Sequence, residues 1–235
     1  IWERLELGKD VYIAERYLDP IEFVRRTLFT DRMRELIRSV FKRLNSIGGD
    51  SIYMVTVPMG GGKSHTLLLL YYTVKYWDKL KNLVLRELGR DLHEPPKDSR
   101  VIVIDGQRIY VEFPDGTRIK TVWGLLYKQL GSYSEEIDSW RYEIQVPELR
   151  ELLSEKPTLI LVDELTSYVA QIATDRIKYE KVLAFIQALT TAVNESPNVV
   201  IIITIPSGVY SKAQSDILSK VKGIASRFSL LQELI

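Results

Sequence analysis

The sequence predicts an α/β fold in which a parallel sheet is covered by helices on both faces. Four short apolar segments have the composition of buried strands, at residues 52–56, 101–105, 159–164 and 198–207. The stretches between them carry apolar residues at helical spacing. Strands that alternate with helices form parallel sheets, because each helix carries the chain back to the edge where the next strand begins.

Helices are predicted from caps and periodicity. Thr30 can cap a helix in which apolar residues recur at helical spacing, namely Met33, Leu36, Ile37, Val40, Phe41 and Leu44. Residues 64–77 are apolar nearly all round and predict a buried helix. Further helices are predicted at 123–130, 147–155 and 176–194. Residues 108–120 alternate about Asp115-Gly116, a turn dipeptide, and predict a β-hairpin.

Length and composition favour a globular, non-membrane protein. The chain has 235 residues, of which 46% are hydrophobic and 27% charged, with a net charge of +1. With no cysteine and two histidines, it offers neither disulfides nor a histidine-built metal site. There is no signal peptide and no apolar run long enough to cross a membrane, so a cytoplasmic location is expected.

The domain organisation is predicted in two parts. Residues 1–48 form an N-terminal extension with a helix that packs on the core, and residues 49–235 form the core itself. The chain begins without a methionine and ends beside the apolar stretch FSLLQELI. We therefore expect a fragment of a longer protein, with more chain beyond residue 235.

The stretch VPMGGGKSH, residues 57–65, resembles the phosphate-binding loop G-x-x-x-x-G-K-[ST] but has Val57 in place of the first glycine. Such a loop points backbone N–H groups at phosphate oxygens. Lys63 would reach the outer phosphates, and the Ser64 hydroxyl would ligate Mg²⁺. The remaining predicted nucleotide contacts are Gly60, Gly61, Gly62 and His65. The alternative is a glycine turn that merely joins a strand to a helix.

A second motif lies at the end of the third strand. Asp163 occupies the place of an aspartate that holds Mg²⁺ through water, and Glu164 is placed to polarise the attacking water. Thr204, at the end of the fourth strand, is predicted to sense the outer phosphate. Ser207 is its nearest competitor, and a threonine satisfied by backbone is the alternative. These motifs predict a P-loop NTPase fold of the additional-strand (ASCE, AAA-like) type, with the site at the carboxyl ends of the strands. That fold family implies the strand order 2-3-4-1.

Several stretches resemble the DUF499 family of large prokaryotic AAA-like ATPases. They are DPIEFVRRTLFTDRMRELI, GGGKSHTLLLLYY, IKTVWGLLYKQLG, KPTLILVDELTSYV and VVIIITIPS, which together span roughly residues 18–208. The WG…QLG tract is the most specific of them. The resemblance implies that Lys63 and Ser64 bind nucleotide and Mg²⁺, that Asp163 and Glu164 form the acidic pair, and that His65 belongs to the loop pattern. It also implies a DNA-processing or defence context.

Two further groups of residues, one basic and one aromatic, each allow two interpretations. The basic helix around residues 32–43 would contact DNA or a neighbouring subunit, or is simply solvated. Three aromatic residues before the glycine loop would wall an adenine pocket or pack in the core, namely Tyr17, Phe23 and Phe29. If subunits of a homo-oligomer share sites, an arginine finger is expected, with Arg176 and Arg227 as candidates.

The predicted function is Mg²⁺-dependent ATP hydrolysis coupled to conformational work on a partner. ATP is favoured over GTP because no guanine-specific N-K-x-D signature is present. The second hypothesis is a nucleotide-gated interaction module with little turnover. A third is a small-molecule kinase, against which Glu164 argues.

Overall fold

The computed structural model describes residues 1–8, 15–58, 62–207, 219, 223 and 229–232. Its centre is a five-stranded sheet with the order β2-β3-β4-β1-β5, in which every pair of neighbours is parallel. The strands are β1 (Ile52–Pro58), β2 (Arg100–Asp105), β3 (Thr158–Asp163), β4 (Val199–Ser207) and β5 (Ser229–Gln232). The four predicted strands and their order are confirmed, and β5 adds a strand that the sequence did not predict.

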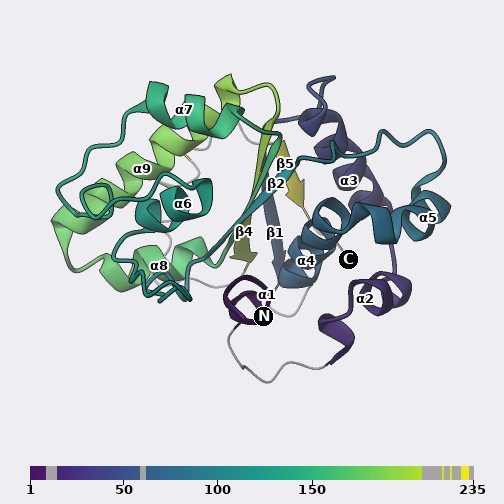
Figure 1. Cartoon of the computed structure of the whole chain (residues 1–235), viewed down its shortest axis with the longest axis horizontal. Coiled ribbons are helices and arrows are strands. Elements are labelled where there is room, and N and C mark those ends of the chain that lie inside the picture. Colours follow the sequence, from purple (N-terminus) through teal and green to yellow (C-terminus); the bar gives the residue numbers. More distant parts are fainter. Residues whose placement is uncertain (9–14, 59–61, 208–218, 220–222, 224–228, 233–235) are drawn as a thin grey trace.

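Two layers of helices cover the sheet (Figure 1). The first group consists of α1 (Trp2–Leu7), the short 3-10 helix Glu15–Tyr17, α2 (Pro20–Arg26), α3 (Asp31–Leu44), α4 (Lys63–Lys75) and α5 (Trp77–Leu88). The second group consists of α6 (Val122–Leu130), α7 (Val146–Ser154), α8 (Leu165–Ile172) and α9 (Arg176–Glu195). Figure 1 shows the second group on one side of the sheet and α3 to α5 on the other.

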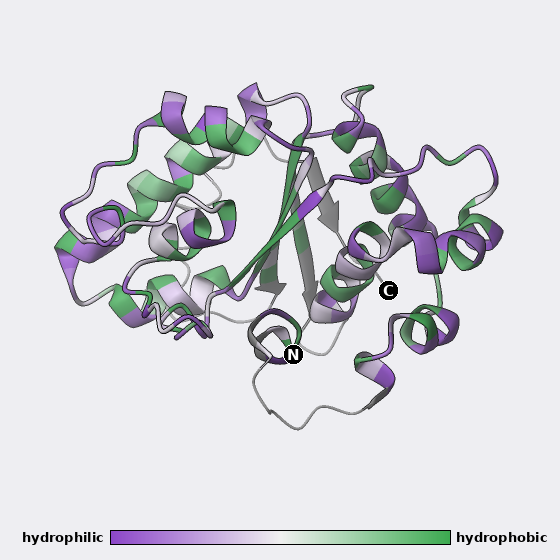
Figure 2. Ribbon diagram, viewed as in Figure 1, coloured by the Kyte–Doolittle hydropathy of each residue, from purple (hydrophilic) through white to green (hydrophobic). Residues whose placement is uncertain are grey.

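Alternate residues of each strand point to opposite faces of the sheet, and both faces are apolar. On β3, Leu159 and Leu161 join the cluster formed with α3 and α4, whereas Ile160 and Val162 join the cluster formed with α6 and α9. This pattern explains why the strands have continuous apolar sequences. Figure 2 shows the same arrangement as apolar residues along the strands and inner helix faces, with polar residues outside.

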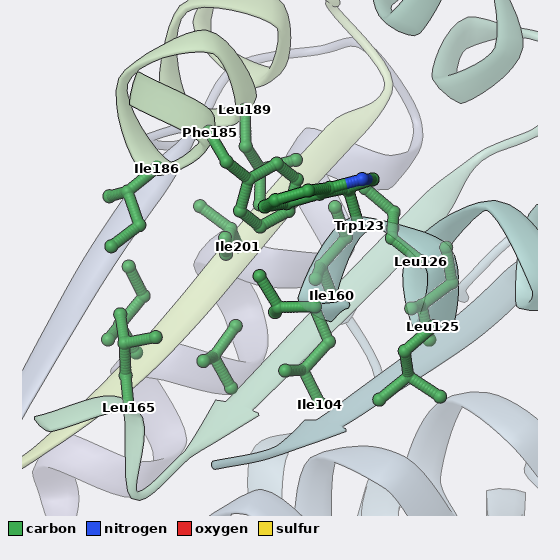
Figure 3. Close-up of a cluster of buried hydrophobic side chains, with 14 of the residues drawn as sticks. Ile104, Trp123, Leu125, Leu126, Ile160, Leu165, Phe185, Ile186, Leu189 and Ile201 are labelled. Carbon is green, nitrogen blue, oxygen red and sulfur yellow. The ribbon is translucent and has the colours of Figure 1, made fainter. Parts of the chain in front are cut away.

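Trp123 is a large, fully buried member of the α6–α9 cluster. Its ring lies against Phe185 and Leu189 of α9, above the isoleucines of the central strands (Figure 3). The indole N–H donates a 2.8 Å hydrogen bond to the backbone oxygen of Ile137, so the buried polar atom is satisfied. Trp123 is therefore a core residue.

At β2, the outer edge of the sheet is capped by a side chain of α6 that hydrogen-bonds to the strand backbone. The amide of Gln129 accepts from the Val103 N–H at 2.9 Å and donates to the Val103 oxygen at 2.9 Å. These are the two backbone groups that a further strand would pair with. Gly131 then ends α6 in the left-handed conformation, with φ of 85°.

The N-terminal helices pack against the sheet and α4. The Thr30 hydroxyl accepts from the Met33 N–H at 3.3 Å, which confirms it as the cap of α3. Six residues of α3 are buried, and they are those predicted from its periodicity. The division into residues 1–48 and 49–235 stays a prediction.

The hairpin predicted at residues 108–120 is present in a short form, with one antiparallel bridge between Glu112 and Arg118. Two backbone hydrogen bonds of 2.9 Å flank it, from the Phe113 N–H to the Thr117 oxygen and from the Ile119 N–H to the Val111 oxygen. The turn at Asp115-Gly116 forms as predicted, since the Gly116 N–H donates to the Phe113 oxygen at 2.9 Å. Ile109 and Val111 are buried against the α6–α9 cluster. Their packing explains the apolar half of the alternating pattern. Among the described residues, no helix has the length and apolar character that crossing a membrane requires.

Candidate nucleotide-binding site

The candidate site lies at the carboxyl ends of the parallel strands, where α4 begins. β1 ends at Pro58, and Gly60 and Gly61 lie outside the described residues. Gly62 precedes α4 with φ of 83° and ψ of 17°, a left-handed conformation that favours glycine. The first turn of α4 closes on this residue, because the Thr66 N–H donates to the Gly62 oxygen at 2.9 Å. This left-handed backbone conformation explains why a glycine precedes Lys63.

Lys63 is the first residue of α4 and is nearly buried, with 8% of its surface exposed. Within the described part of the chain, no carboxylate lies within ion-pair distance of its ammonium group. A cation taken out of water without a partner is costly. Its position at a helix N-terminus adds positive potential, so this corner of the fold suits an anion.

Ser64, Asp163 and Thr204 come together although they lie far apart in sequence. The Ser64 hydroxyl donates to Asp163 Oδ2 at 2.9 Å, and the Thr204 hydroxyl donates to Asp163 Oδ1 at 2.6 Å. Asp163 and Thr204 are buried, with 5% and 1% exposure. The carboxylate is therefore fixed from both sides, by the start of α4 and by the end of β4.

These groups fit a magnesium ion. Hydroxyl and carboxylate oxygens are the donors that Mg²⁺ prefers, and it usually keeps several waters and substrate phosphate oxygens as its other ligands. Among the described residues, no group of three or more acids or histidines could form an all-protein metal cage. A site with one hydroxyl and one carboxylate suits a metal that arrives with a phosphate ligand.

Glu164 follows Asp163 in an unusual backbone conformation, with φ of 52°. Its N–H donates to Thr204 Oγ1 at 3.4 Å, and its Oε2 accepts from the Ser167 hydroxyl at 2.8 Å. A left-handed residue that is not glycine costs conformational energy and is often found at functional sites. The carboxylate of Glu164 is thereby held over the first turn of α8 by Ser167, a partner that the sequence did not reveal.

His65 contacts the N-terminal segment. Its ring lies 4.5 Å from the Phe23 ring, centre to centre, and Nε2 lies 3.1 Å from the Thr27 hydroxyl oxygen. Since that hydroxyl donates to the Phe23 oxygen at 2.8 Å, Nε2–H of the histidine is the donor in the second bond. Burial lowers the pKa of His65. The side chain thus joins α2 to the start of α4.

The aromatic residues considered for an adenine pocket pack in the protein interior. Phe23 and Phe29 are buried in the cluster on the α4 side of the sheet, and Tyr17 packs against that cluster at its edge. The Tyr17 backbone oxygen accepts from the Tyr72 hydroxyl at 2.5 Å. Core packing accounts for Phe23 and Phe29.

The remaining candidates are spread over the chain. Arg176 is exposed at the start of α9 and pairs with Glu180 at 2.8 Å. Arg227 lies outside the described residues, as do the side chains of Val57 and Ser207. The two finger candidates therefore stay predictions.

Asp105 at the end of β2 is a residue near the site that the sequence did not single out. It is the register partner of Asp163 on the neighbouring strand. Burial, and then the charge of Asp163, raise the pKa of Asp105. The sequence does carry a signal, since VIVID ends in an acid just as LILVD does.

The sheet order defines the class of the fold. β4 lies between β1, which leads to the glycine loop, and β3, which ends in Asp163. This inserted strand is the mark of the additional-strand, AAA-like P-loop NTPases, so the chain has that fold. The chain belongs to the DUF499 family, because residues 6–222 match the DUF499 N-terminal domain.

Two solved structures are similar at low identity. The structure of PCH-2 from C. elegans shares 14% identity with a TM-score of 0.40, covering 90% of this chain and 46% of that one. The structure of ORC2 from Aeropyrum pernix, in ADPNP and ADP complexes, shares 15% identity with a TM-score of 0.45, covering 93% of this chain and 51% of that one. The chain thus spans about half the length of each. No relative was found among curated proteins.

Proposed function

We propose that this chain binds ATP with Mg²⁺ and hydrolyses it, and that hydrolysis drives conformational work on a partner. The observation that carries the proposal is that Lys63, at the N-terminus of α4, is nearly buried and has no carboxylate partner among the described residues. Nucleotide phosphates would supply the charge that this corner of the fold lacks. The opposite wall is the hydrogen-bonded set of Ser64, Asp163 and Thr204.

Each residue has a distinct part in this proposal. Lys63 and the N–H groups at the start of α4 hold the outer phosphates. Ser64 and Asp163 hold Mg²⁺, Asp163 through water; the bound ion would neutralise phosphate charge. Thr204 keeps the Asp163 carboxylate in one orientation. Glu164 is the candidate general base, and its N–H contact with Thr204 places it beside the same set.

A nucleotide-gated switch is the second candidate function, and the Ser167–Glu164 hydrogen bond favours it. A carboxylate engaged by its own helix is a weaker acceptor for a proton from water. Release of this bond on nucleotide binding would convert the switch into the hydrolytic form. The two functions therefore differ in whether turnover follows binding.

Steady-state ATP hydrolysis with Mg²⁺ tests the proposal. We expect turnover by the parent chain, loss of turnover by roughly 10²- to 10⁴-fold in Glu164→Gln with binding retained, and loss of binding in Lys63→Ala. Glu151→Gln and Lys156→Ala change exposed side chains of the same kinds and serve as matched controls. A parent chain that binds no nucleotide would refute the proposal, and a Glu164→Gln variant with parental turnover would refute the general-base assignment.

Light scattering separates the switch from the ATPase. A switch would assemble with ATP and not with ADP, and Glu164→Gln would leave that assembly unchanged. The same measurements with duplex DNA address the DNA-processing context implied by the family, in which stimulated turnover is the expected sign of a DNA partner. A small-molecule kinase would instead transfer phosphate to an added acceptor.

A further inference from the structure

Three polar residues at neighbouring strand ends lie level with one another on one face of the sheet. Asp105 of β2 is the register partner of Asp163 of β3. Val162 pairs with Ile203, which places Asp163 level with Thr204 of β4. The apolar residues two positions earlier all belong to the cluster on the α4 side, namely Val103, Leu161 and Ile202. Because side chains alternate along a strand, the three polar residues also face α4.

The backbone fixes Asp105 in this row. The Gly106 N–H donates to the Asp163 oxygen at 2.8 Å and so continues the ladder past the strand end. A Cβ at Gly106 would come 2.2 Å from the Glu164 backbone oxygen, so no other residue fits there without displacement of that segment. The end of β2 is thus packed directly onto the backbone of residues 163–165.

One oxygen of the Asp105 carboxylate is available for a ligand. Oδ1 accepts from the Gln107 N–H at 3.0 Å, which forms a local turn. In the described part of the chain, Oδ2 accepts no hydrogen bond. Neighbouring strands are about 4.8 Å apart, so two carboxylates of like charge stand side by side at this edge. Burial and the charge of Asp163 raise the pKa of Asp105, and the charges of Arg108 and of the N-terminal ammonium group act on it in the opposite direction. Such a pair of carboxylates is stabilised by a cation or by the waters bound to one.

We propose that Asp105 is a positioning residue of the candidate nucleotide site, whose carboxylate accepts hydrogen bonds from the waters of the divalent cation held beside Asp163. The proposal rests on the proposed nucleotide function and adds one residue to it. Asp105 then raises the affinity for the cation and orients its water shell. The competing role is a local one, in which Asp105 caps the turn to Gln107 and interacts with the charge of Arg108.

Binding of Mn²⁺ and ADP tests the proposal without any turnover. Asp105→Asn keeps the acceptor oxygen for the Gln107 N–H and removes the charge. We expect its Mn²⁺ affinity in the presence of ADP, followed by electron paramagnetic resonance, to fall roughly tenfold or more. ADP binding in EDTA should stay equal or become tighter, because one negative charge beside the phosphate site is removed. Asp105→Ser, which also caps turns, should behave in the same way.

The outcomes are distinguishable. Asp98 is exposed and lies just before β2 begins, at the other end of the strand, so Asp98→Asn should match the parent in both measurements. Structural damage would weaken ADP binding with and without Mn²⁺ alike, and that result overturns the proposal. Equal Mn²⁺ affinity in the parent and Asp105→Asn overturns it and leaves the nucleotide function standing. If the parent binds no ADP under either condition, both proposals fall.

Discussion

Asp138 occupies the space that a side chain on Gly124 would need: a Cβ at Gly124 would come 2.0 Å from Asp138 Oδ1. Asp138 follows α6 in the sequence, and its side chain is fully buried against the start of that helix. It accepts from the Thr121 N–H and hydroxyl, each at 2.8 Å, and from the Lys120 N–H at 2.9 Å. We predict that Gly124→Ala lowers the free energy of unfolding by roughly 1–3 kcal/mol or more, measured by urea denaturation.

Gly131→Ala is the matched control for that variant. A Cβ at Gly131 meets nothing within 4 Å, so only its left-handed backbone opposes the change, at roughly 1–2 kcal/mol. In an Asp138→Ala background the cost of Gly124→Ala should shrink, whereas the cost of Gly131→Ala should not. Additive costs of Gly124→Ala and Asp138→Ala would contradict the steric explanation.

Gln129 gives a second stability prediction. Gln129→Leu leaves the Val103 N–H and oxygen without their partner, at roughly 1–3 kcal/mol for each group that stays buried. Gln129→Glu can accept from the N–H but cannot donate to the oxygen, so its cost should lie between that of the parent and that of Gln129→Leu. Urea denaturation measures the free energy of unfolding of both variants. Because an unpaired strand edge promotes association, both variants should also scatter more light than the parent as the protein is concentrated. Exposed Gln187 on α9 supplies the control, as Gln187→Leu.

The sequence predicted the strands and the helices with strong periodicity, and the missed elements have physical reasons. α8 carries the apolar spacing Leu165, Tyr168, Val169 and Ile172, but it is eight residues long and starts without a side-chain cap. α5 follows α4 after Tyr76 alone, so no turn signal separates the two. β5 is short, and its partner β1 lies far away in sequence.

Three arginines on the basic face of α3 contact other parts of the fold. Arg34 pairs with Glu87 and Arg38 with Asp91, at 3.3 Å in both cases. Arg43 donates to backbone oxygens at the end of α9 and the start of β4, namely Val193, Asn194, Ser196 and Val199. These three arginines contact the end of α5 or the α9–β4 connection, so they are not simply solvated. Contact of this helix with DNA or a neighbouring subunit stays a prediction. Local sequence patterns do not indicate a contact such as Arg43 with Val199, whose residues lie 156 positions apart.

Arg43→Met should therefore destabilise the protein, by roughly 1.5–3 kcal/mol for loss of hydrogen bonds to a charged group. The terminal carbonyls of α9 would lose their donor. Lys42→Met, on the exposed side of the same turn, should change the free energy of unfolding by less than about 0.5 kcal/mol. Equal effects of the two variants in thermal or urea unfolding would contradict this role for Arg43.

The residues of the candidate site could be predicted where they belong to a sequence motif. They could not be predicted where only the register between strands brings them to the site. Lys63, Ser64, Asp163 and Thr204 were all predicted from the sequence as site residues, and the structure brings the last three into contact. Asp105 required the pairing of β2 with β3, which no local pattern gives. The Ser167 contact to Glu164 depends on a left-handed backbone that the sequence does not indicate.

Thr204→Val removes the hydroxyl that fixes Asp163 and keeps the side-chain shape. Losing a hydrogen bond to a carboxylate costs about 1.5–3 kcal/mol, so turnover should fall roughly 10- to 100-fold if the bond persists in the reacting complex. ADP affinity should change little, because the proposed role of Thr204 is to orient Asp163 and not to bind the phosphates. Thr204→Ser keeps the hydroxyl and should retain most of the turnover. A Val variant with the parental kcat would show that Thr204 is satisfied locally and serves no such role.

His65 predicts a pH dependence of stability. Burial lowers its pKa below the ordinary value of about 6.5, so protonation favours the unfolded chain. The neutral histidine, bonded to Thr27, contributes stability that is complete above pH 6.5 and is lost as the pH falls through the lowered pKa. In His65→Gln, the free energy of unfolding should decrease less between pH 7.5 and 5.5 than in the parent. His93 is exposed, so His93→Gln should keep the parental pH dependence. If His65→Gln and the parent lose the same amount, the packing of His65 against Phe23 and Thr27 does not control this part of the pH profile.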